Sequence, residues 1–189
     1  MNVMHLSAEC YPVAKVGGLG DVVGALPKYL CEAGINASVV LPYYDRKFVR
    51  ENTFDPVFKS TGMLGSKTFE YHILKERNRT LGFDLYLIQI AGLLDRPEIY
   101  CYPDEIEQFI CFQLSFLDWI NKSDIKPDII HCHDHHTGLI PFLISHTITY
   151  SKLASIPTVC TIHNGQYQGW FGWDKISYLP AFDLNKAGL

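Results

Sequence analysis

The sequence predicts an α/β fold in which helices flank a parallel β-sheet, with a β-hairpin insertion. Within the first ~40 residues, an apolar strand, a glycine-rich loop, a helix and a second apolar strand follow one another, which is the βαβ unit of a parallel sheet. Strands and a helical stretch alternate again near the end of the chain. Between residues 54 and 90 no helical period occurs, which favours hairpins that extend one edge of the sheet.

The first unit is expected to contain a strand over residues 2–7 and another over residues 35–41. Between them, the spacing of apolar residues predicts a helix that begins near Asp21 and ends at Gly34. Pro27 falls inside this helix and not in its first turn. Because proline removes a helical hydrogen bond, we expect a kink or a break there.

The remaining elements are expected in chain order as strands over 54–61, 67–74 and 81–90, a helix over about 104–121, a strand over 128–132, a helix over about 137–147 and a strand over 157–162. Residues after His163 are rich in Gly, Tyr and Trp, and the last ones, 185–189, complete no element. The sequence is therefore expected to be a fragment of a longer protein.

Composition narrows the class of protein. Of 189 residues, 48% are hydrophobic and 19% charged, which is typical of a folded domain. A net charge of −4 argues against a nucleic-acid-binding surface. No signal peptide and no apolar run of transmembrane length is visible, so we expect a cytoplasmic protein without a membrane partner. The six cysteines form no C-x-x-C pair, which favours buried free thiols over disulfides or a zinc site.

Glycines gather after the first strand, at residues 17–24 (GGLGDVVG). From Gly18 the spacing is G-x-G-x-x-x-G, one residue longer than the dinucleotide fingerprint, and the G-K-[ST] of a P-loop is missing. Backbone amides and the positive end of a following helix attract anions, and Lys15 adds a full charge. A tight strand-to-helix turn with a solvated lysine explains the pattern equally well.

Four histidines occur within residues 131–136 (HCHDHH), directly after a strand. A dinuclear metal site of the type H-x-H-x-D-H would need aspartate at position 135, but the aspartate is Asp134. A polar cluster at a strand end is therefore favoured over a metal site. A third polar cluster, residues 161–169 (TIHNGQYQG), also follows an apolar strand. Because ligands of open α/β sheets bind at the carboxyl ends of strands, Lys15, Asp134 and His163 are expected at one edge.

These blocks together carry a family resemblance. The matching segments are residues 7–22 (SAECYPVAKVGGLGDV), 24–27 (GALP), 95–97 (DRP), 131–138 (HCHDHHTG) and 161–169 (TIHNGQYQG). The first resembles the K-[TV]-G-G-L-[AG]-D-V signature of ADP-glucose-type glycogen and starch synthases, and GALP accounts for Pro27. The resemblance covers essentially the whole chain. This sequence departs from the family at His135, where tryptophan is usual, and in the pattern that follows DRP.

The resemblance implies the N-terminal, acceptor-side half of a GT-B glycosyltransferase, with a Rossmann-like domain over residues 1–189 truncated before its end and the C-terminal nucleotide-binding domain absent. The implied reaction moves glucose from ADP-glucose to the non-reducing end of an α-1,4-glucan with retained configuration. ADP-glucose is the donor substrate, and neither a cofactor nor a metal is implied. The partners would be the nucleotide sugar and the glucan, and this fragment alone would be inactive.

Roles follow from the matching positions. Lys15, with the amides of Gly17 and Gly18, would neutralise the donor diphosphate. His163 would lie at the transferred glucose, and the carboxylates of Asp134 and Asp21 would hold sugar hydroxyls or orient Lys15 and the acceptor. These assignments concern catalysis and donor binding.

Sugar binding is expected at Asn164 and at an aromatic segment containing Tyr167, Trp170 and Phe171, unless these rings are ordinary core residues. Three other functions stay open: a GT-B transferase with another nucleotide sugar or acceptor, a metal-dependent hydrolase, and a non-catalytic glucan-binding module. Oligomeric state, regulation and acceptor length have no signature in the sequence.

Overall fold

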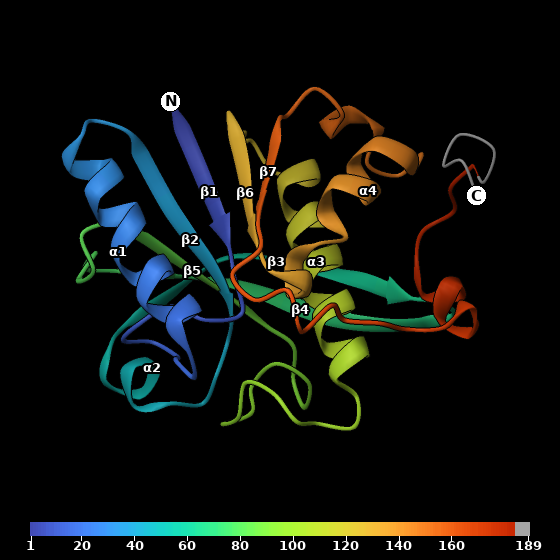
Figure 1. Ribbon diagram of the computed structural model, residues 1–189, viewed down its shortest axis with the longest axis horizontal. Coiled ribbons are helices and arrows are strands. Elements are labelled where there is room, and N and C mark those ends of the chain that lie inside the picture. The colour runs from blue at the N-terminus through green and yellow to red at the C-terminus, as the bar shows by residue number, and fades with distance from the viewer. Residues whose placement is uncertain (184–189) are drawn as a thin grey trace.

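The structure, a computed structural model, describes residues 1–183, and its strands form one sheet (Figure 1). The strands are β1 (Asn2–Leu6), β2 (Asn36–Pro42), β3 (Phe54–Leu64), β4 (Lys67–Glu76), β5 (Asp84–Gln89), β6 (Ile129–His133) and β7 (Thr158–Thr161). The helices are α1 (Gly18–Glu32), α2 (Lys47–Glu51), α3 (Glu105–Lys122) and α4 (Ile140–His146), with 3₁₀ turns η1 (His135–Thr137), η2 (Ser151–Leu153) and η3 (Trp173–Tyr178).

The strand order is β3-β4-β5-β2-β1-β6-β7. From β5 to β7 all neighbours are parallel, whereas β4 runs antiparallel to both β5 and β3. The α/β class and the hairpin at one edge of the sheet are therefore confirmed. The chain moves from β1 outward to β2 on one side, while β6 joins β1 on the other side. Open α/β sheets usually bind ligands in the crevice at such a reversal, which here lies at the carboxyl ends of β1 and β6.

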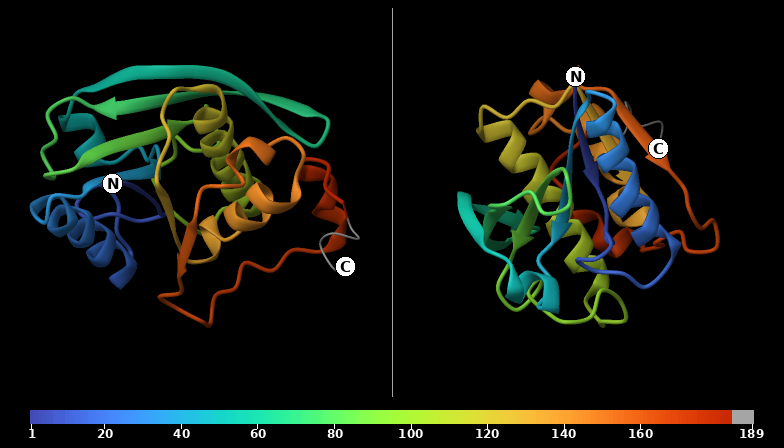
Figure 2. Two further views of the ribbon diagram at one scale, coloured as in Figure 1. Left: turned by 90° about the horizontal axis from the view of Figure 1, so that it is seen from above. Right: turned by 90° about the vertical axis from the view of Figure 1, so that its left-hand side faces the viewer.

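Two apolar layers cover the sheet, as the alternation along β2 shows. Val39 and Leu41 pack in one cluster with Val23 of α1, whereas Val40 packs in the other cluster with α3 residues such as Phe112. In the right-hand view of Figure 2, α1 and α3 accordingly lie on either side of β1. In the left-hand view the β3–β4 hairpin runs over α3, and the Tyr71 hydroxyl donates a hydrogen bond to Asp118 of that helix.

Of the kink or break expected at Pro27, the break is wrong, because α1 continues through this residue. A proline cannot donate to the carbonyl four residues earlier, which here belongs to Val23. The thiol of Cys10 donates to that carbonyl at 3.6 Å and partly compensates for the missing bond. The helix ends as expected, with Gly34 following it at a φ of 84°.

Several boundaries differ from the sequence-based expectation. Helix α1 begins at Gly18, three residues earlier than expected, and β5 begins at Asp84 instead of residue 81. The short helix α2 was not expected, and the helix expected over 137–147 is shortened to α4, with the separate turn η1 before it. The expectation for residues 185–189 lies outside the described residues. All six cysteines are free, but Cys101 and Cys160 are exposed, contrary to the expectation of burial. No helix among the described residues is long and apolar enough to cross a membrane.

Candidate active site

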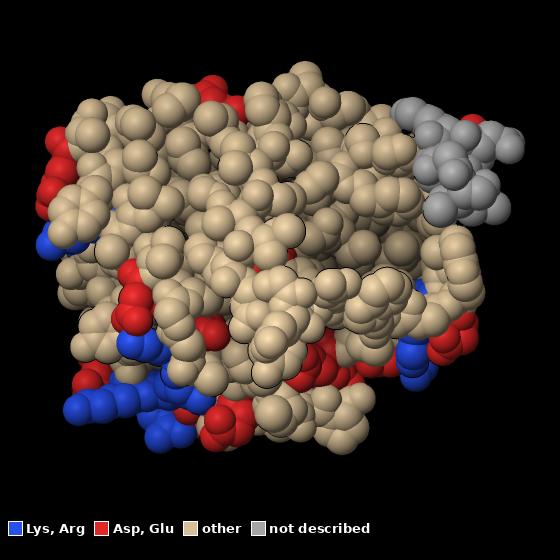
Figure 3. All heavy atoms as spheres, in the orientation of Figure 1, with Lys and Arg blue, Asp and Glu red and all other residues tan. Residues whose placement is uncertain are grey.

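The loop between β1 and α1 presents Lys15 at the carboxyl edge of the sheet. Its ammonium lies 2.7 Å from the carboxylate of Asp21, in the first turn of α1, and both side chains are partly exposed. Lys15 also lines a shallow hollow of about 600 Å³ with Arg46 and Lys47. In Figure 3, Lys and Arg side chains gather at the lower left, where Figure 1 shows α2. The hollow therefore contains cationic side chains near Lys15, although Arg46 is paired at 3.2 Å with Glu98, which lines the same hollow.

A buried carboxylate that sequence reasoning did not assign shapes this loop. Glu9 is 3% exposed, and one of its oxygens accepts the amides of Val16 at 2.6 Å and Gly17 at 2.9 Å. Its other oxygen accepts the Tyr100 hydroxyl at 2.8 Å. The Gly17 amide, expected to face a phosphate, thus donates to a side chain of the protein itself. Burial, then the hydrogen bond to Glu9, raises the pKa of Tyr100.

Close packing explains one glycine of the signature. A Cβ atom on Gly24 would lie 2.5 Å from the Tyr11 carbonyl oxygen, so any side chain would push α1 away from the loop. The Tyr11 amide in turn donates to the Gly20 carbonyl at 2.9 Å. The glycines therefore hold the first turns of α1 against the loop that carries Lys15.

Asp134 joins the ends of β6 and β7. One carboxylate oxygen accepts the His163 amide at 2.6 Å and the Asn164 amide at 3.4 Å, and the Asp134 amide donates to the Thr161 carbonyl at 3.0 Å. Its φ of 59° with ψ of −177° lies in a region that is nearly restricted to glycine and costs about 1–3 kcal/mol. The strain is offset by the bonds that place His163, so Asp134, His163 and Asn164 form one unit.

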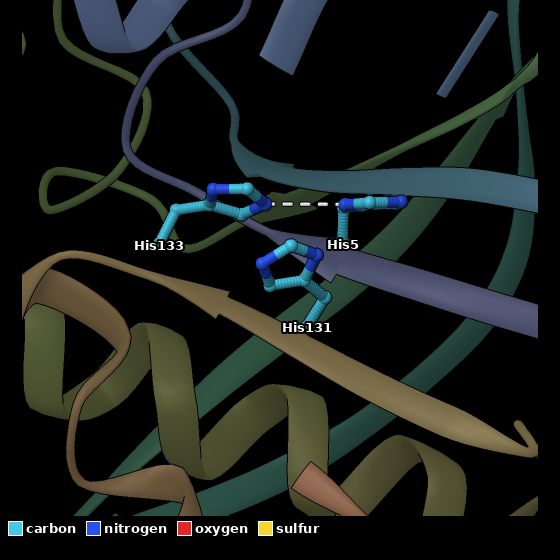
Figure 4. Close-up of side chains that lie close together, drawn as sticks. All are labelled: His5, His131 and His133. Atoms are coloured by element: carbon cyan, nitrogen blue, oxygen red, sulfur yellow. Dashed lines mark hydrogen bonds between the residues drawn. The ribbon is translucent and has the colours of Figure 1, made fainter. Parts of the chain in front are cut away.

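A chain of imidazoles runs from His163 into the core. His163 Nε2 lies 2.9 Å from His133 Nδ1, and His133 Nε2 lies 3.1 Å from His5 Nδ1. Figure 4 shows the second contact and His131 beside it. His131 hydrogen-bonds Thr161 Oγ1 at 2.7 Å. Two-residue spacing on β6 sends His131 and His133 to one face of the sheet.

The buried members of this chain are neutral at physiological pH. Burial, followed by repulsion from His131, lowers the pKa of His5 to about 4. Burial, followed by the neighbouring histidines, lowers the pKa of His133 to about 2. A neutral imidazole carries one N–H, so each contact in the chain fixes which nitrogen of the next ring holds the proton.

A cleft of about 430 Å³ opens beside this unit. Its walls are provided by α3, by the segment after β6 and by residues 168–171, including His135, His136, Trp170 and Phe171. His136 stacks on Tyr100 with ring centroids 4.9 Å apart, and burial, followed by repulsion from His135, lowers its pKa to about 3. Tyr100 therefore links the Glu9 side of the site to the cleft.

The predicted aromatic wall is only partly assembled. Trp170 is 84% exposed and Tyr167 is 67% exposed, which rules out ordinary core packing for both rings. Trp170 and Phe171 line the cleft, whereas Tyr167 is not among its lining residues.

Gly18, one of the two glycines expected at the donor phosphate, lies at the start of α1 with open space where a side chain would project.

Comparison with known proteins decides the family. The sequence profile described as the starch synthase catalytic domain matches residues 2–188. The chain belongs to this family. A glycogen synthase of Flavobacterium johnsoniae is 56% identical over 188 residues, which is 100% of this chain and 40% of that protein. A glycogen synthase of Halalkalibacterium halodurans is 40% identical over 182 residues, 96% of this chain and 37% of that protein.

The fold comparison agrees with the family. The catalytic domain of starch synthase IV from Arabidopsis thaliana, bound to ADP and acarbose, matches with a TM-score of 0.86 and 30% identity, over 98% of this chain and 38% of that chain. The fold expected from the sequence, the N-terminal Rossmann-like half of a GT-B fold, is therefore confirmed. The chain spans about two fifths of the length of the relatives it matches.

Proposed function

We propose that the complete protein is a retaining glycosyltransferase that moves glucose from ADP-glucose to the non-reducing end of an α-1,4-glucan, and that residues 1–189 supply its N-terminal, acceptor-side domain. Family membership and the glycogen synthase names of the relatives support this proposal. The observation that carries it is the strained Asp134, which holds the His163 and Asn164 amides at the crevice between β1 and β6.

Lys15 is the proposed contact to the donor diphosphate. When the glucose–phosphate bond breaks, negative charge grows on the leaving diphosphate, and a fixed ammonium stabilises that charge. The ion pair with Asp21, at 2.7 Å, orients the ammonium group of Lys15 at the start of α1. Because Glu9 occupies the Gly17 amide, the Gly18 amide at the start of α1 and the Lys15 ammonium are the better candidates for the phosphate contact.

His163 is the proposed contact to the transferred glucose, where positive charge develops at the anomeric carbon. Its backbone is held by Asp134, and its ring is held by His133. A residue fixed at both ends needs little reorganisation when the transition state forms, which is the basis of electrostatic preorganisation. Asn164 would donate to a sugar hydroxyl, and Trp170 with Phe171 would stack on a glucose ring in the cleft.

The position of Lys15 and His163 also supports a cleft whose contacts to the substrates come from two domains. The hydrogen-bonded groups around Lys15 and His163 face one edge of the sheet, as expected for one side of a two-domain cleft. A second domain would supply the remaining contacts to the nucleotide, so residues 1–189 alone are expected to be inactive. A cytoplasmic location belongs to the same proposal and is supported by the six free cysteines.

The test is transfer from ADP-glucose to glycogen by the complete protein carrying Lys15→Ala. We expect kcat/KM for the donor to fall about 100-fold, because one charge-stabilising group is removed. Lys28→Ala, which removes an exposed lysine of the helix α1 that follows the loop, is the matched control and should retain activity. Retention of donor affinity and turnover within a few-fold by Lys15→Ala would contradict the phosphate assignment.

Donor choice is tested separately with UDP-glucose in place of ADP-glucose. Faster transfer from UDP-glucose would identify a related transferase of the same fold. Glucan binding without transfer from either donor would identify a non-catalytic binding module.

A further inference from the structure

Three potential metal ligands meet at the mouth of the cleft, although they come from different parts of the chain. Glu105 is the first residue of α3, and His135 and His136 form most of η1. One ligand atom from each residue lies within 4.8 Å of the other two. Two imidazoles and one carboxylate are a common donor set for Zn²⁺ and related divalent ions, with further positions left for water or substrate.

The two imidazoles have unsatisfied nitrogens. Among the described residues, His135 Nδ1 and His136 Nδ1 are buried and have no hydrogen-bond partner. His136 is only 6% exposed, and its ring is held between Tyr100 and Phe109, with centroids 4.9 and 4.5 Å away. A buried nitrogen without a partner costs free energy, and coordination to a metal ion is one way to satisfy it.

The carboxylate is already oriented. One oxygen of Glu105 accepts the amide of Cys101 at 2.8 Å. Hydrogen bonds of this kind hold metal-binding carboxylates in place. Bonds of about 2.0–2.2 Å to a tetrahedral ion bring ligand atoms to roughly 3.4 Å from each other, so separations within 4.8 Å would contract by at most about 1.4 Å. Rotation of the partly exposed Glu105 side chain can provide this movement.

The cleft gives an ion access from solvent. Glu105, His135 and His136 all line it, together with Gln168 and Trp170. We propose that Glu105, His135 and His136 form a binding site for a divalent transition-metal ion of the zinc class, with an open coordination position facing the cleft. The sequence did not indicate this site, because Glu105 lies thirty residues before His135 and only the fold brings them together.

The buried cluster of His5, His131 and His133 is a weaker candidate. Its ligand atoms also lie within 4.8 Å of one another. However, Nδ1 of His5 and both nitrogens of His133 already take part in hydrogen bonds. In Figure 4, the unbonded nitrogen of His5 points away from the other two rings. An ion would therefore have to break existing bonds in a place without a carboxylate.

The test is calorimetric titration of Zn²⁺ into the complete protein after removal of metals with a chelator. We expect one equivalent to bind, and we expect His135→Phe and Glu105→Gln each to weaken binding at least about ten-fold. Phenylalanine keeps the ring while removing its nitrogens, and glutamine keeps an acceptor for the Cys101 amide. His72→Gln is the matched control, because His72 lies 3.3 Å from Glu70 on the hairpin, away from the cleft.

Three outcomes would overturn the site: no equimolar binding, unchanged affinity in both cleft variants, or loss of binding in His72→Gln. Co²⁺ provides a second measurement, since its visible spectrum reports nitrogen and oxygen ligation directly. The spectrum should change in His135→Phe and persist in His72→Gln. Circular dichroism checks that each variant is folded. None of these readouts depends on glucosyl transfer, so the outcome is independent of the proposed function.

Discussion

Two histidine clusters lie within a few residues of each other in sequence and have opposite characters. His131 and His133 belong to β6 and point into the core, where hydrogen bonds connect them to Thr161, His5 and His163. His135 and His136 belong to η1 and line the cleft, where a nitrogen of each has no hydrogen-bond partner among the described residues. Strand geometry therefore produces a closed cluster whose rings are hydrogen-bonded to one another, although Nε2 of His5 has no partner among the described residues, and the following turn produces a cluster that is open to the cleft. The closed cluster is suited to holding the ring of His163 in place, and the open cluster is suited to binding a ligand in the cleft.

The largest expected effect is an acid sensitivity of the closed cluster. The folded-state pKa values of His5 and His133, about 4 and about 2, lie below the unfolded value near 6.5. The unfolded chain therefore binds protons first as the pH falls. The contribution of these two neutral histidines to the free energy of unfolding is fully present above pH 6.5 and declines below it. Each neutral buried histidine contributes a slope of about 1.4 kcal/mol per pH unit in the free energy of unfolding, or about 2.8 for the two.

Urea unfolding between pH 7 and pH 4.5 measures this slope. His5→Phe should lower the proton uptake on unfolding by about one, because phenylalanine cannot bind a proton. His72→Gln serves as the control and should unfold with nearly the wild-type pH dependence. An unchanged slope in His5→Phe would show that His5 does not remain neutral in the folded protein.

A somewhat smaller effect is expected when the closed cluster is disconnected from His163. His133→Phe removes the contact that fixes the ring of His163. We expect kcat for glucosyl transfer to fall about 30-fold with little change in the donor KM, since His133 acts through His163 and does not contact the donor. His133→Gln, which can still donate a hydrogen bond, should recover part of the loss. Equal losses in both variants, or a change confined to KM, would contradict a positioning role.

The smallest effect concerns the open cluster. An ion that binds only the folded protein stabilises it by about 1.4 kcal/mol when its free concentration is ten times the dissociation constant. Thermal unfolding with and without Zn²⁺ should show this gain in the wild-type protein and at most about 0.4 kcal/mol in His135→Phe, whose affinity is expected to be at least ten-fold lower. A similar gain in both proteins would place the ion elsewhere.

The sequence was most informative where local pattern determines structure. The β1–α1–β2 unit and the amphipathic α3 follow from the spacing of apolar residues. The expected break at Pro27 failed because the compensating thiol, Cys10, comes from a different segment. The short helix α2 was missed because five residues are too few for a helical period to be recognised.

The site likewise divides into residues that local pattern could predict and residues whose contacts come from distant segments. Lys15, Asp134 and His163 could be proposed because each follows a strand whose end could be recognised. Glu9 was missed although it lies in the same motif, because its partners become visible only when the loop folds back over it. The contact between His133 and His163 joins residues thirty positions apart, and only the pairing of β6 with β7 brings them together.

The buried carboxylate of Glu9 affects how the loop after β1 would bind an anion. Its carboxylate already accepts hydrogen bonds from the amides of Val16 and Gly17, so the loop contains its own negative charge. Lys15 is likewise matched by Asp21. In the proposed function, the donor diphosphate would enter by exchange, because Lys15 would leave the carboxylate of Asp21 for a phosphate. The driving force would then be the difference in free energy between two ion pairs, which would permit both capture of the donor and release of the product.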